Sequence, residues 1–425
     1  MKKMKWFFLV LIVAACSPAL VIKKQLGEIQ NLQQDHIGFS LYDPATKKSL
    51  IQYNDAKYFT PASNTKIFTF YTSLKLLGDS INALTYVQQN DSLIFWGLGD
   101  PSFLNPLAYD NGRAFQFLKN APGKLYFSSS NFKTDALGNG WAWDDYNYNY
   151  SIERSSFTLY GNLITLKKQG EKVVTQPSFF EEHLITANEN HSEEEVVRAI
   201  DDNQLTYYPG KRKFKTQEIP FHVSADLLAD LLTDTLKRQV EHVFIPLKRG
   251  TILKSIPADS IYRVMMQDSD NFMAEQLLLQ CAAVVSDTLK PEIAIRYATK
   301  NFMNTLPDKP QWVDGSGLSR FNLFTPRTIV SLWEKIYNEV PRERLFRLLA
   351  VGGESGTIKN WYKHTPPFIF AKTGTLSNNH TLSGFIITKK GKTLIFSWMN
   401  NNFVTPTNEV RKKMEKLLLE IREKY

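Results

Sequence analysis

The middle of the chain, from about Leu84 to Pro220, differs in residue pattern from the segments on either side of it. It contains short strand-like runs, aromatic clusters and many turn residues, and helical periodicity does not return until Ala225. Before this region, Ile37–Tyr42 and Ser49–Tyr53 flank a run of turn residues and predict a β-hairpin. The pattern therefore predicts a mainly β inserted region after the first elements of the fold.

The chain after the insertion alternates between helical and strand-like patterns. Helices are predicted over residues 224–240, 258–266, 272–285 and, at the end of the chain, along a stripe from Val410 to Ile421, and a hairpin over 382–388 and 393–400. Strands at both ends with helices between them predict one α/β (α+β) domain that is interrupted. The expected organisation is a catalytic domain in two parts, 24–83 and 221–425, with an inserted region over 84–220.

Composition narrows the class of protein. The chain has 425 residues, of which 43% are hydrophobic and 22% charged, enough for a large core and a second domain. The only cysteines, Cys16 and Cys281, lie in such different contexts that no disulfide is expected. The seven histidines form no H-E-x-x-H motif and no cluster with cysteine, so neither a zinc-peptidase site nor any other metal or cofactor is predicted.

The amino terminus has the pattern of an export signal. Lys2, Lys3 and Lys5 precede an apolar run from Trp6 to Val13 that ends in small residues, so residues 1–15 are expected to be removed. The junction Val13-Ala14-Ala15-Cys16 resembles a bacterial lipobox, which favours lipidation of Cys16 and a membrane anchor over ordinary cleavage. A cell-envelope or periplasmic location is expected.

The formal net charge is +9 and stays positive without the signal. A basic surface suits an anionic envelope or wall polymer, or is an ordinary solvated face. No nucleic-acid partner is predicted.

A serine and a lysine are placed three residues apart where a helix is predicted to begin. Ser63 and Lys66 follow Pro61 and open an amphipathic pattern, so the lysine amine can reach the serine hydroxyl. Such a lysine becomes a base only if burial or a second cation lowers its pKa. A second S-x-x-K pattern, Ser130 to Lys133, follows a strand-like run and opens no helix, so the first pattern is the candidate.

Two further motifs complete a known set. Ser269-Asp270-Asn271 lies between two predicted helices and offers a hydroxyl and a carboxamide, and Lys372-Thr373-Gly374 lies in a strand-like run and supplies a second cation. In this order, S-x-x-K, S-D-N and K-T-G are the signature of the penicillin-interacting serine enzymes.

The sequence around these motifs resembles the low-molecular-mass class C penicillin-binding proteins, which are D-Ala-D-Ala carboxypeptidases and endopeptidases. The similar segments are residues 61–66, 97–102, 314–320 and 371–376, and the resemblance runs from about Gly38 to Asn400. It implies a transpeptidase/β-lactamase-like domain, with helices on an antiparallel sheet, interrupted by an insertion made mainly of strands. The implied partners are peptidoglycan stem peptides and cross-links, with β-lactams as covalent inhibitors.

The resemblance also implies a role for each motif residue. Ser63 attacks the carbonyl between two D-alanines, Lys66 removes its proton, Ser269 and Lys372 pass that proton to the leaving amine, and Asn271 orients Lys66 and the substrate. The substrate-binding residues implied are Thr373, Gly374, Thr375 and Ser316. The backbone amides of Ser63 and Thr375 are expected to form the oxyanion hole.

Two other patterns allow two interpretations each. The aromatic segment from Trp141 to Tyr150 predicts either a wall for a wall-derived substrate or packing of the insertion, and packing is preferred. Glu334 and Asn338 match the deacylation motif of β-lactamases but fit a helix face better. The alternative functions are a serine β-lactamase and a catalytically idle wall-binding lipoprotein.

Overall fold

The computed structural model describes residues 17–108, 112–170 and 172–425. The predicted signal and Cys16 lie outside the described residues. Within these three ranges no helix combines the length and the apolar composition needed to cross a membrane.

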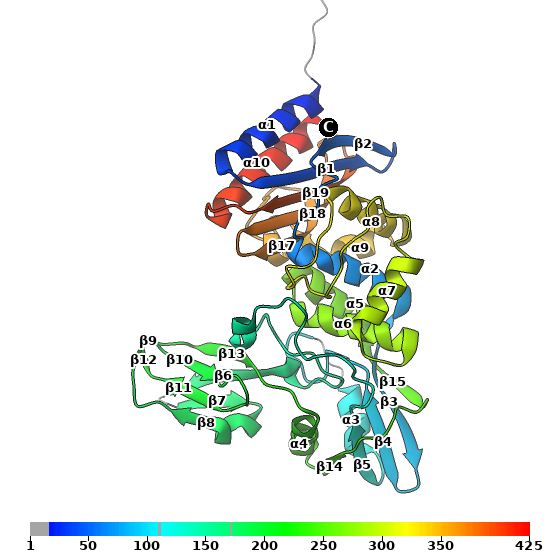
Figure 1. Cartoon of the computed structure of the whole chain (residues 1–425), viewed down its shortest axis with the longest axis vertical. Helices are drawn as coiled ribbons and strands as arrows, with labels where there is room; N and C mark the ends of the chain where they lie inside the picture. Colours follow the sequence, from blue (N-terminus) through cyan, green and yellow to red (C-terminus); the bar gives the residue numbers. More distant parts are fainter. Residues whose placement is uncertain (1–16, 109–111, 171) are drawn as a thin grey trace, which may run out of the picture.

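A six-stranded sheet forms one end of the molecule (Figure 1). Its strand order is β16-β17-β18-β19-β1-β2, and the bounds are β1 His36–Asp43, β2 Lys48–Tyr53, β16 Ala350–Val351, β17 Ile369–Leu376, β18 Asn379–Ile387 and β19 Thr393–Asn401. The two predicted hairpins are therefore confirmed as β1–β2 and β18–β19. They are joined to each other because β1 pairs antiparallel with β19, with Phe39 opposite Trp398.

Alternating side chains in these strands give the sheet two apolar faces, because successive residues of a strand point to opposite sides. Leu382, Leu394 and Phe396 pack with α1 (Pro18–Gln33) and α10 (Thr407–Lys424), whereas Phe385 and Ile395 pack with the helices on the other face. Figure 1 shows α1 and α10 side by side over the sheet. Helix α10 was predicted from its apolar stripe, and α1 was not predicted.

The helices on the other face include those that begin at the motifs. They are α2 Lys66–Leu76, α5 Ala258–Arg263, α6 Asn271–Ser286, α7 Pro291–Asn301, α8 Pro326–Glu339 and α9 Arg342–Leu348. The predicted helix over 258–266 ends in a π-helical turn, Val264–Asp268, directly before Ser269. Such turns often occur at functional sites.

A second sheet of five strands lies at the far end of the molecule, in the order β14-β5-β4-β3-β15. Its strands are β3 Ser80–Gln89, β4 Ser92–Gly97, β5 Lys124–Ser128, β14 Val240–His242 and β15 Thr251–Pro257. Helices α3 (Arg113–Asn120) and α4 (Ala225–Leu236) contribute to the same apolar cluster as this sheet. The prediction of a helix after Ser224 is confirmed, and Ser224 caps it, whereas α3 was not predicted.

Three small sheets complete the middle region, with the orders β13-β6-β7, β10-β11-β8 and β12-β9. Their strands are β6 Leu163–Gln169, β7 Lys172–Gln176, β8 Leu184–Thr186, β9 His191–Glu193, β10 Glu195–Arg198, β11 Leu205–Tyr208, β12 Gly210–Arg212 and β13 Thr216–Pro220. The five-stranded sheet joins chain from both sides of residue 220, because β15 pairs with β3 and β14 with β5. We therefore propose that the inserted unit runs from Ser80 to Pro257.

Candidate active site

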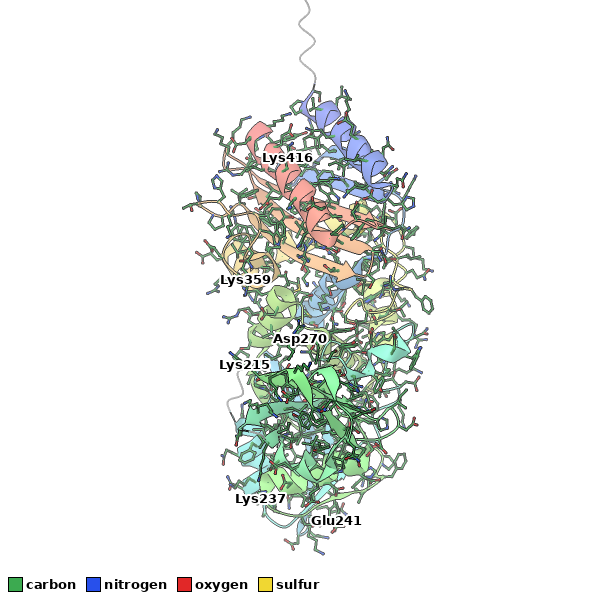
Figure 2. The ribbon with its side chains drawn as sticks, turned by 90° about the vertical axis from the view of Figure 1, so that its left-hand side faces the viewer. Lys215, Lys237, Glu241, Asp270, Lys359 and Lys416 are labelled. Carbon is green, nitrogen blue, oxygen red and sulfur yellow. The ribbon has the colours of Figure 1, made fainter. Side chains whose placement is uncertain are left out.

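The three sequence motifs come together between the six-stranded sheet and the helices. Ser63 lies in a 3-10 turn, Ala62–Thr65, that leads directly into α2. Ser269 follows the π-helical turn, Asn271 begins α6, and Lys372 lies on β17. Figure 2 labels Asp270, the N-cap of α6, near the middle of the long axis of the molecule, between the two ends formed by the sheets.

Lys66 is held by three oxygen atoms. Its Nζ atom lies 2.8 Å from Ser63 Oγ, 2.6 Å from Asn271 Oδ1 and 2.7 Å from the carbonyl oxygen of Ser316. Its side chain is fully buried, and this burial lowers the pKa of Lys66 to about 8 despite the opposing charges of nearby acids. At pH 7 about one tenth of such lysines are neutral and able to accept a proton.

Lys372 forms a second contact between a buried lysine amine and a serine hydroxyl. Its Nζ atom donates to Ser269 Oγ at 2.7 Å and to the carbonyl oxygen of Thr373 at 2.8 Å. Burial, reinforced by the positive charge of Lys66, holds the pKa of Lys372 well below its ordinary value. Ser269 has a left-handed backbone, with φ of 66°. This unusual conformation for a serine is typical of functional sites.

Strand β17 approaches the turn that carries Ser63 very closely. A Cβ atom on Gly374 would lie 2.8 Å from the backbone nitrogen of Ser63 and 2.6 Å from the carbonyl oxygen of Pro61. Only glycine fits there without displacing one of the two segments. The close approach holds strand β17 against the backbone of the turn that carries Ser63.

Asn64 fixes the same turn to the sheet from beneath. Its Nδ2 donates to Thr381 Oγ1 at 2.5 Å, and its Oδ1 accepts a hydrogen bond from Ser383 Oγ. Thr381 Oγ1 in turn donates to the carbonyl oxygen of Pro61 at 2.9 Å. Sequence reasoning missed Asn64, although its place inside the S-x-x-K motif was a signal that it lies close to the serine.

Ser316 does not occupy the position that the sequence predicted. It was expected to bind substrate, but its side chain is fully buried, and its hydroxyl accepts a hydrogen bond from the backbone of Leu318. Its carbonyl oxygen holds Lys66, and its backbone nitrogen donates to Glu275 Oε1 at 2.7 Å. The prediction for the Ser316 side chain is therefore wrong, because the turn around Gly315 and Gly317 directs the backbone toward the lysine.

Glu275 is a buried charge that sequence reasoning also missed. Burial and the nearby carboxylate of Asp314 raise the pKa of Glu275 to about 7, while the adjacent Arg154 acts in the opposite direction. The two side chains form a buried ion pair with 3.4 Å between Arg154 Nη1 and Glu275 Oε2. Because Arg154 comes from the inserted region and Glu275 from α6, this pair connects the insertion to the helix that begins at Asn271.

A cleft of about 910 Å³ opens above the serine. Ser63, Ser269 and Asn271 line it, together with Thr373 and Thr375 of β17. Thr373 Oγ1 also donates to Thr357 Oγ1, another lining residue, at 2.7 Å. Hydroxyl groups from two segments are therefore available at the floor of the cleft.

The opposite wall is made by the aromatic segment of the insertion. Trp141, Asp144, Asp145 and Tyr150 line the cleft, and the backbone carbonyl of Tyr150 accepts a hydrogen bond from Asn271 Nδ2 at 2.8 Å. Trp143 is 74% exposed and does not pack in a core. The interpretation as packing holds for Tyr146, whose ring lies against Arg198 within the insertion. It does not hold for Trp141 and Tyr150, which line the cleft.

Charges of both signs line the cleft. Asp144 and Asp145 lie on the insertion wall, and Tyr150 donates a hydrogen bond to Asp145 Oδ1 at 2.8 Å. Arg320 and Arg411 also line it, Arg320 donating to the carbonyl oxygen of Ser377 at 3.4 Å. The cleft can therefore hold a ligand that carries both an amine and a carboxylate.

The second S-x-x-K pattern and the motif similar to the β-lactamase deacylation motif do not line the cleft. The hydroxyl of Ser130 donates to the carbonyl oxygen of Ile245 at 2.6 Å, while Lys133 lies over the ring of Phe244. Glu334 lies on α8 and accepts a hydrogen bond from Tyr42 at 2.6 Å, which supports the helix-face interpretation. Among residues 17–108, 112–170 and 172–425, no group of three or more His, Cys, Asp or Glu side chains is arranged to hold a metal ion.

Comparisons with known proteins agree on one family. The sequence model described as the D-Ala-D-Ala carboxypeptidase 3 (S13) family matches residues 20–423. The D-alanyl-D-alanine carboxypeptidase DacB of Haemophilus influenzae is 26% identical, with 90% of this chain and 89% of that protein covered. A D-alanyl-D-alanine carboxypeptidase of Actinomadura is 25% identical, with 87% and 78% covered.

Solved structures have the same fold. The crystal structure of penicillin binding protein 4 (dacB) from Haemophilus influenzae matches with a TM-score of 0.72 and 21% identity, covering 92% of this chain and 98% of that chain. A predatory peptidoglycan endopeptidase from Bdellovibrio bacteriovorus matches with a TM-score of 0.50 and 13% identity, covering 90% and 92%. These likenesses agree with an α+β domain interrupted by an insertion.

Proposed function

The chain belongs to the D-Ala-D-Ala carboxypeptidase 3 (S13) family and is a serine-type D-Ala-D-Ala carboxypeptidase, and we propose that Ser63 is its nucleophile and Lys66 the base that activates it. The observation that carries this proposal is the 2.8 Å contact between Lys66 Nζ and Ser63 Oγ, made by a lysine whose pKa burial lowers to about 8. A neutral amine at this distance can accept the hydroxyl proton as the serine attacks.

In acylation, Ser63 Oγ bonds to the carbonyl carbon between two D-alanines, and its proton passes to Lys66. The C–N bond then breaks, and the leaving amine takes a proton from the Ser269 hydroxyl, which Lys372 resupplies. The 2.7 Å contact between Lys372 Nζ and Ser269 Oγ supports this relay. In deacylation, water attacks the ester carbon and gives a proton through Ser269 to Lys372. The C–O bond to Ser63 then breaks, Ser63 Oγ takes its proton back from Lys66, and the shortened peptide leaves.

The backbone N–H groups of Ser63 and Thr375 are the proposed oxyanion hole. The close fit of Gly374 against Ser63 supports this assignment, because it sets two rigid backbone segments beside the reacting carbonyl. Rigid donors that face the site of developing charge cost no reorganisation during the reaction. Thr373 and Thr375, on the cleft floor, are the proposed partners of the substrate's terminal carboxylate, with Lys372 providing positive charge beneath them.

The substrate is a stem peptide of peptidoglycan, and we propose that the enzyme also cuts cross-links between stems. The support is the size and charge of the cleft: about 910 Å³ holds more than a D-alanine pair, and both acids and arginines line it. In this proposal Asp144 and Asp145 face an amine on the substrate, and Arg320 faces a carboxylate. β-Lactams are proposed to acylate the same serine.

The β-lactamase alternative loses its candidate base, because Glu334 lies on a helix face and bonds to Tyr42. A catalytically idle wall-binding protein is not favoured by the family match. Purified muropeptides, digested by the enzyme and by Ser63→Ala and analysed by mass, test the proposal. The expected products are pentapeptides shortened by one alanine and cut dimers, both absent with Ser63→Ala, and unchanged substrates would contradict it.

A substrate in the wall requires export, so we propose that the enzyme acts in the cell envelope, anchored by a lipid on Cys16. The sequence around Cys16 supports this. Cys16→Ala is expected to move the protein from the detergent phase to the aqueous phase. Unchanged partitioning would mean ordinary cleavage and an unanchored enzyme.

A further inference from the structure

A second cavity, of about 560 Å³, lies where α2 and α6 end against the five-stranded sheet. The residues that line it include Leu76 at the end of α2, the C-cap residue Leu77, Gln280 and Val284 of α6, and Ile252 and Lys254 of β15. A helix rises 1.5 Å per residue, so Gln280 lies about 13 Å along α6 from the catalytic Asn271. The cavity shares no lining residue with the catalytic cleft.

Gln280 is the unusual residue of this cavity. Its side chain is only 1% exposed, yet neither Nε2 nor Oε1 has a hydrogen-bond partner among the described residues. A buried polar group left without a partner costs about 1–3 kcal/mol. A primary amide presents a donor and an acceptor side by side, and a peptide group presents the matching acceptor and donor. The chemistry of Gln280 therefore fits a ligand that contains an amide.

The charged residues at the rim of the cavity favour a negatively charged group on the ligand. Lys248, Arg249 and Lys254 line it, and the acid among the lining residues, Asp287, lies 3.8 Å from Arg249. Three cations against one acid leave excess positive charge around the opening, which favours a carboxylate.

The walls of the cavity are apolar and incompletely covered. Ile252 is 52% exposed and Val284 is 47% exposed, and Leu76 and Leu98 also face the cavity. A ligand with a small apolar side chain would cover this surface and gain free energy in proportion to the area removed from water.

We propose that this cavity binds a short acylated peptide with a free carboxylate, at a site separate from the catalytic cleft. The peptide group pairs with Gln280, an apolar side chain lies against Ile252 and Val284, and the carboxylate faces Lys248 and Lys254. A volume of about 560 Å³ is within the range of small-molecule sites.

The probe is N-acetyl-L-photoleucyl-L-alanine, whose diazirine labels the residues beside it and whose L-alanine terminus is not a D-Ala-D-Ala substrate. Peptide mapping after illumination is expected to place the label on the segments that carry Ile252 or Val284. Unlabelled N-acetyl-L-leucyl-L-alanine should suppress this labelling, and its C-terminal amide should need at least a tenfold higher concentration.

Two variants test the assignment. Gln280→Leu keeps the volume, removes both polar atoms and should lower labelling at least tenfold, and Lys254→Gln, on the exposed rim, should lower it at least threefold. D-Ala-D-Ala carboxypeptidase activity checks that each variant is folded, and Lys254→Gln remains informative if Gln280→Leu does not fold. Absent labelling, labelling confined to the catalytic cleft, full labelling of the folded variants, or equal competition by the C-terminal amide would each overturn the proposal.

Discussion

Asn271 Oδ1 accepts a hydrogen bond from Lys66 Nζ at 2.6 Å, while Asn271 Nδ2 donates to the carbonyl oxygen of Tyr150 at 2.8 Å. One amide thus connects the proposed base to the wall of the cleft. Because an amide carries no charge, it orients the lysine without stabilising its protonated form as a carboxylate would.

This arrangement predicts a defined pH dependence. The neutral form of Lys66 is the proposed base, and burial lowers the pKa of Lys66 to about 8. The acylation rate should therefore rise with pH and level off above about pH 8. Asn271→Asp places a carboxylate beside the ammonium group, which favours the charged form and should move the rising limb to higher pH. Stopped-flow acylation by a reporter β-lactam measures both profiles, and a limb that stays in place in the variant would argue against Lys66 as the base.

Lys372 is predicted to act through its position beneath the cleft. Lys372→Ala removes the cation bonded to Ser269 and should cost at least about 2 kcal/mol of transition-state stabilisation. Lys359→Ala is the control, because this lysine is exposed on the surface (Figure 2) and is not among the residues that line the cleft. A kcat/KM for a D-Ala-D-Ala peptide within twofold of the parent in Lys372→Ala would refute the role.

Asp144 and Asp145 are predicted to distinguish large substrates from small ones. They line the cleft from the inserted region, and the acids whose charges act on the pKa of Lys66 are others, namely Asp270, Asp314 and Glu275. The charges of Asp144 and Asp145 are therefore expected to act on remote parts of a substrate. The double variant with asparagine at both positions should lower kcat/KM on muropeptides at least tenfold and change penicillin acylation less than threefold. Equal losses in the two assays would mean that the pair supports the wall structurally.

The three motifs predicted which side chains lie together in the site. Each of S-x-x-K, S-D-N and K-T-G lies at the start of a helix or on a strand, and the hydrophobic pattern of the sequence predicted those elements. The amphipathic helix after Ser63 and the strand around Lys372 were both expected, and both are present. Periodicity could not predict the parts that depend on contacts between distant segments. The pairing of β15 with β3 is one such case, and the contact of Asn64 with Thr381 and Ser383 is another.

The misread residues share a physical cause. Ser316 follows a glycine and precedes another, and whether its side chain or its carbonyl faces Lys66 is decided by the turn and not by residue type. Packing was the preferred interpretation for the whole aromatic segment, whereas Trp141 and Tyr150 line the cleft and a hydrogen bond from Asn271 holds the backbone of Tyr150 there. Helix α1 was missed because its hydrophobic face is narrow, with Ile22 and Leu26 as its buried apolar residues.

The identity of the nucleophile is the central claim, and one measurement tests it directly. The enzyme is incubated with benzylpenicillin, and intact mass with peptide mapping locates the covalent adduct. We predict one adduct on the peptide that contains Ser63, lost in Ser63→Ala and kept in Ser130→Ala, whose hydroxyl bonds to Ile245 outside the cleft. An adduct that persists in Ser63→Ala, or one that disappears in Ser130→Ala, would contradict the account.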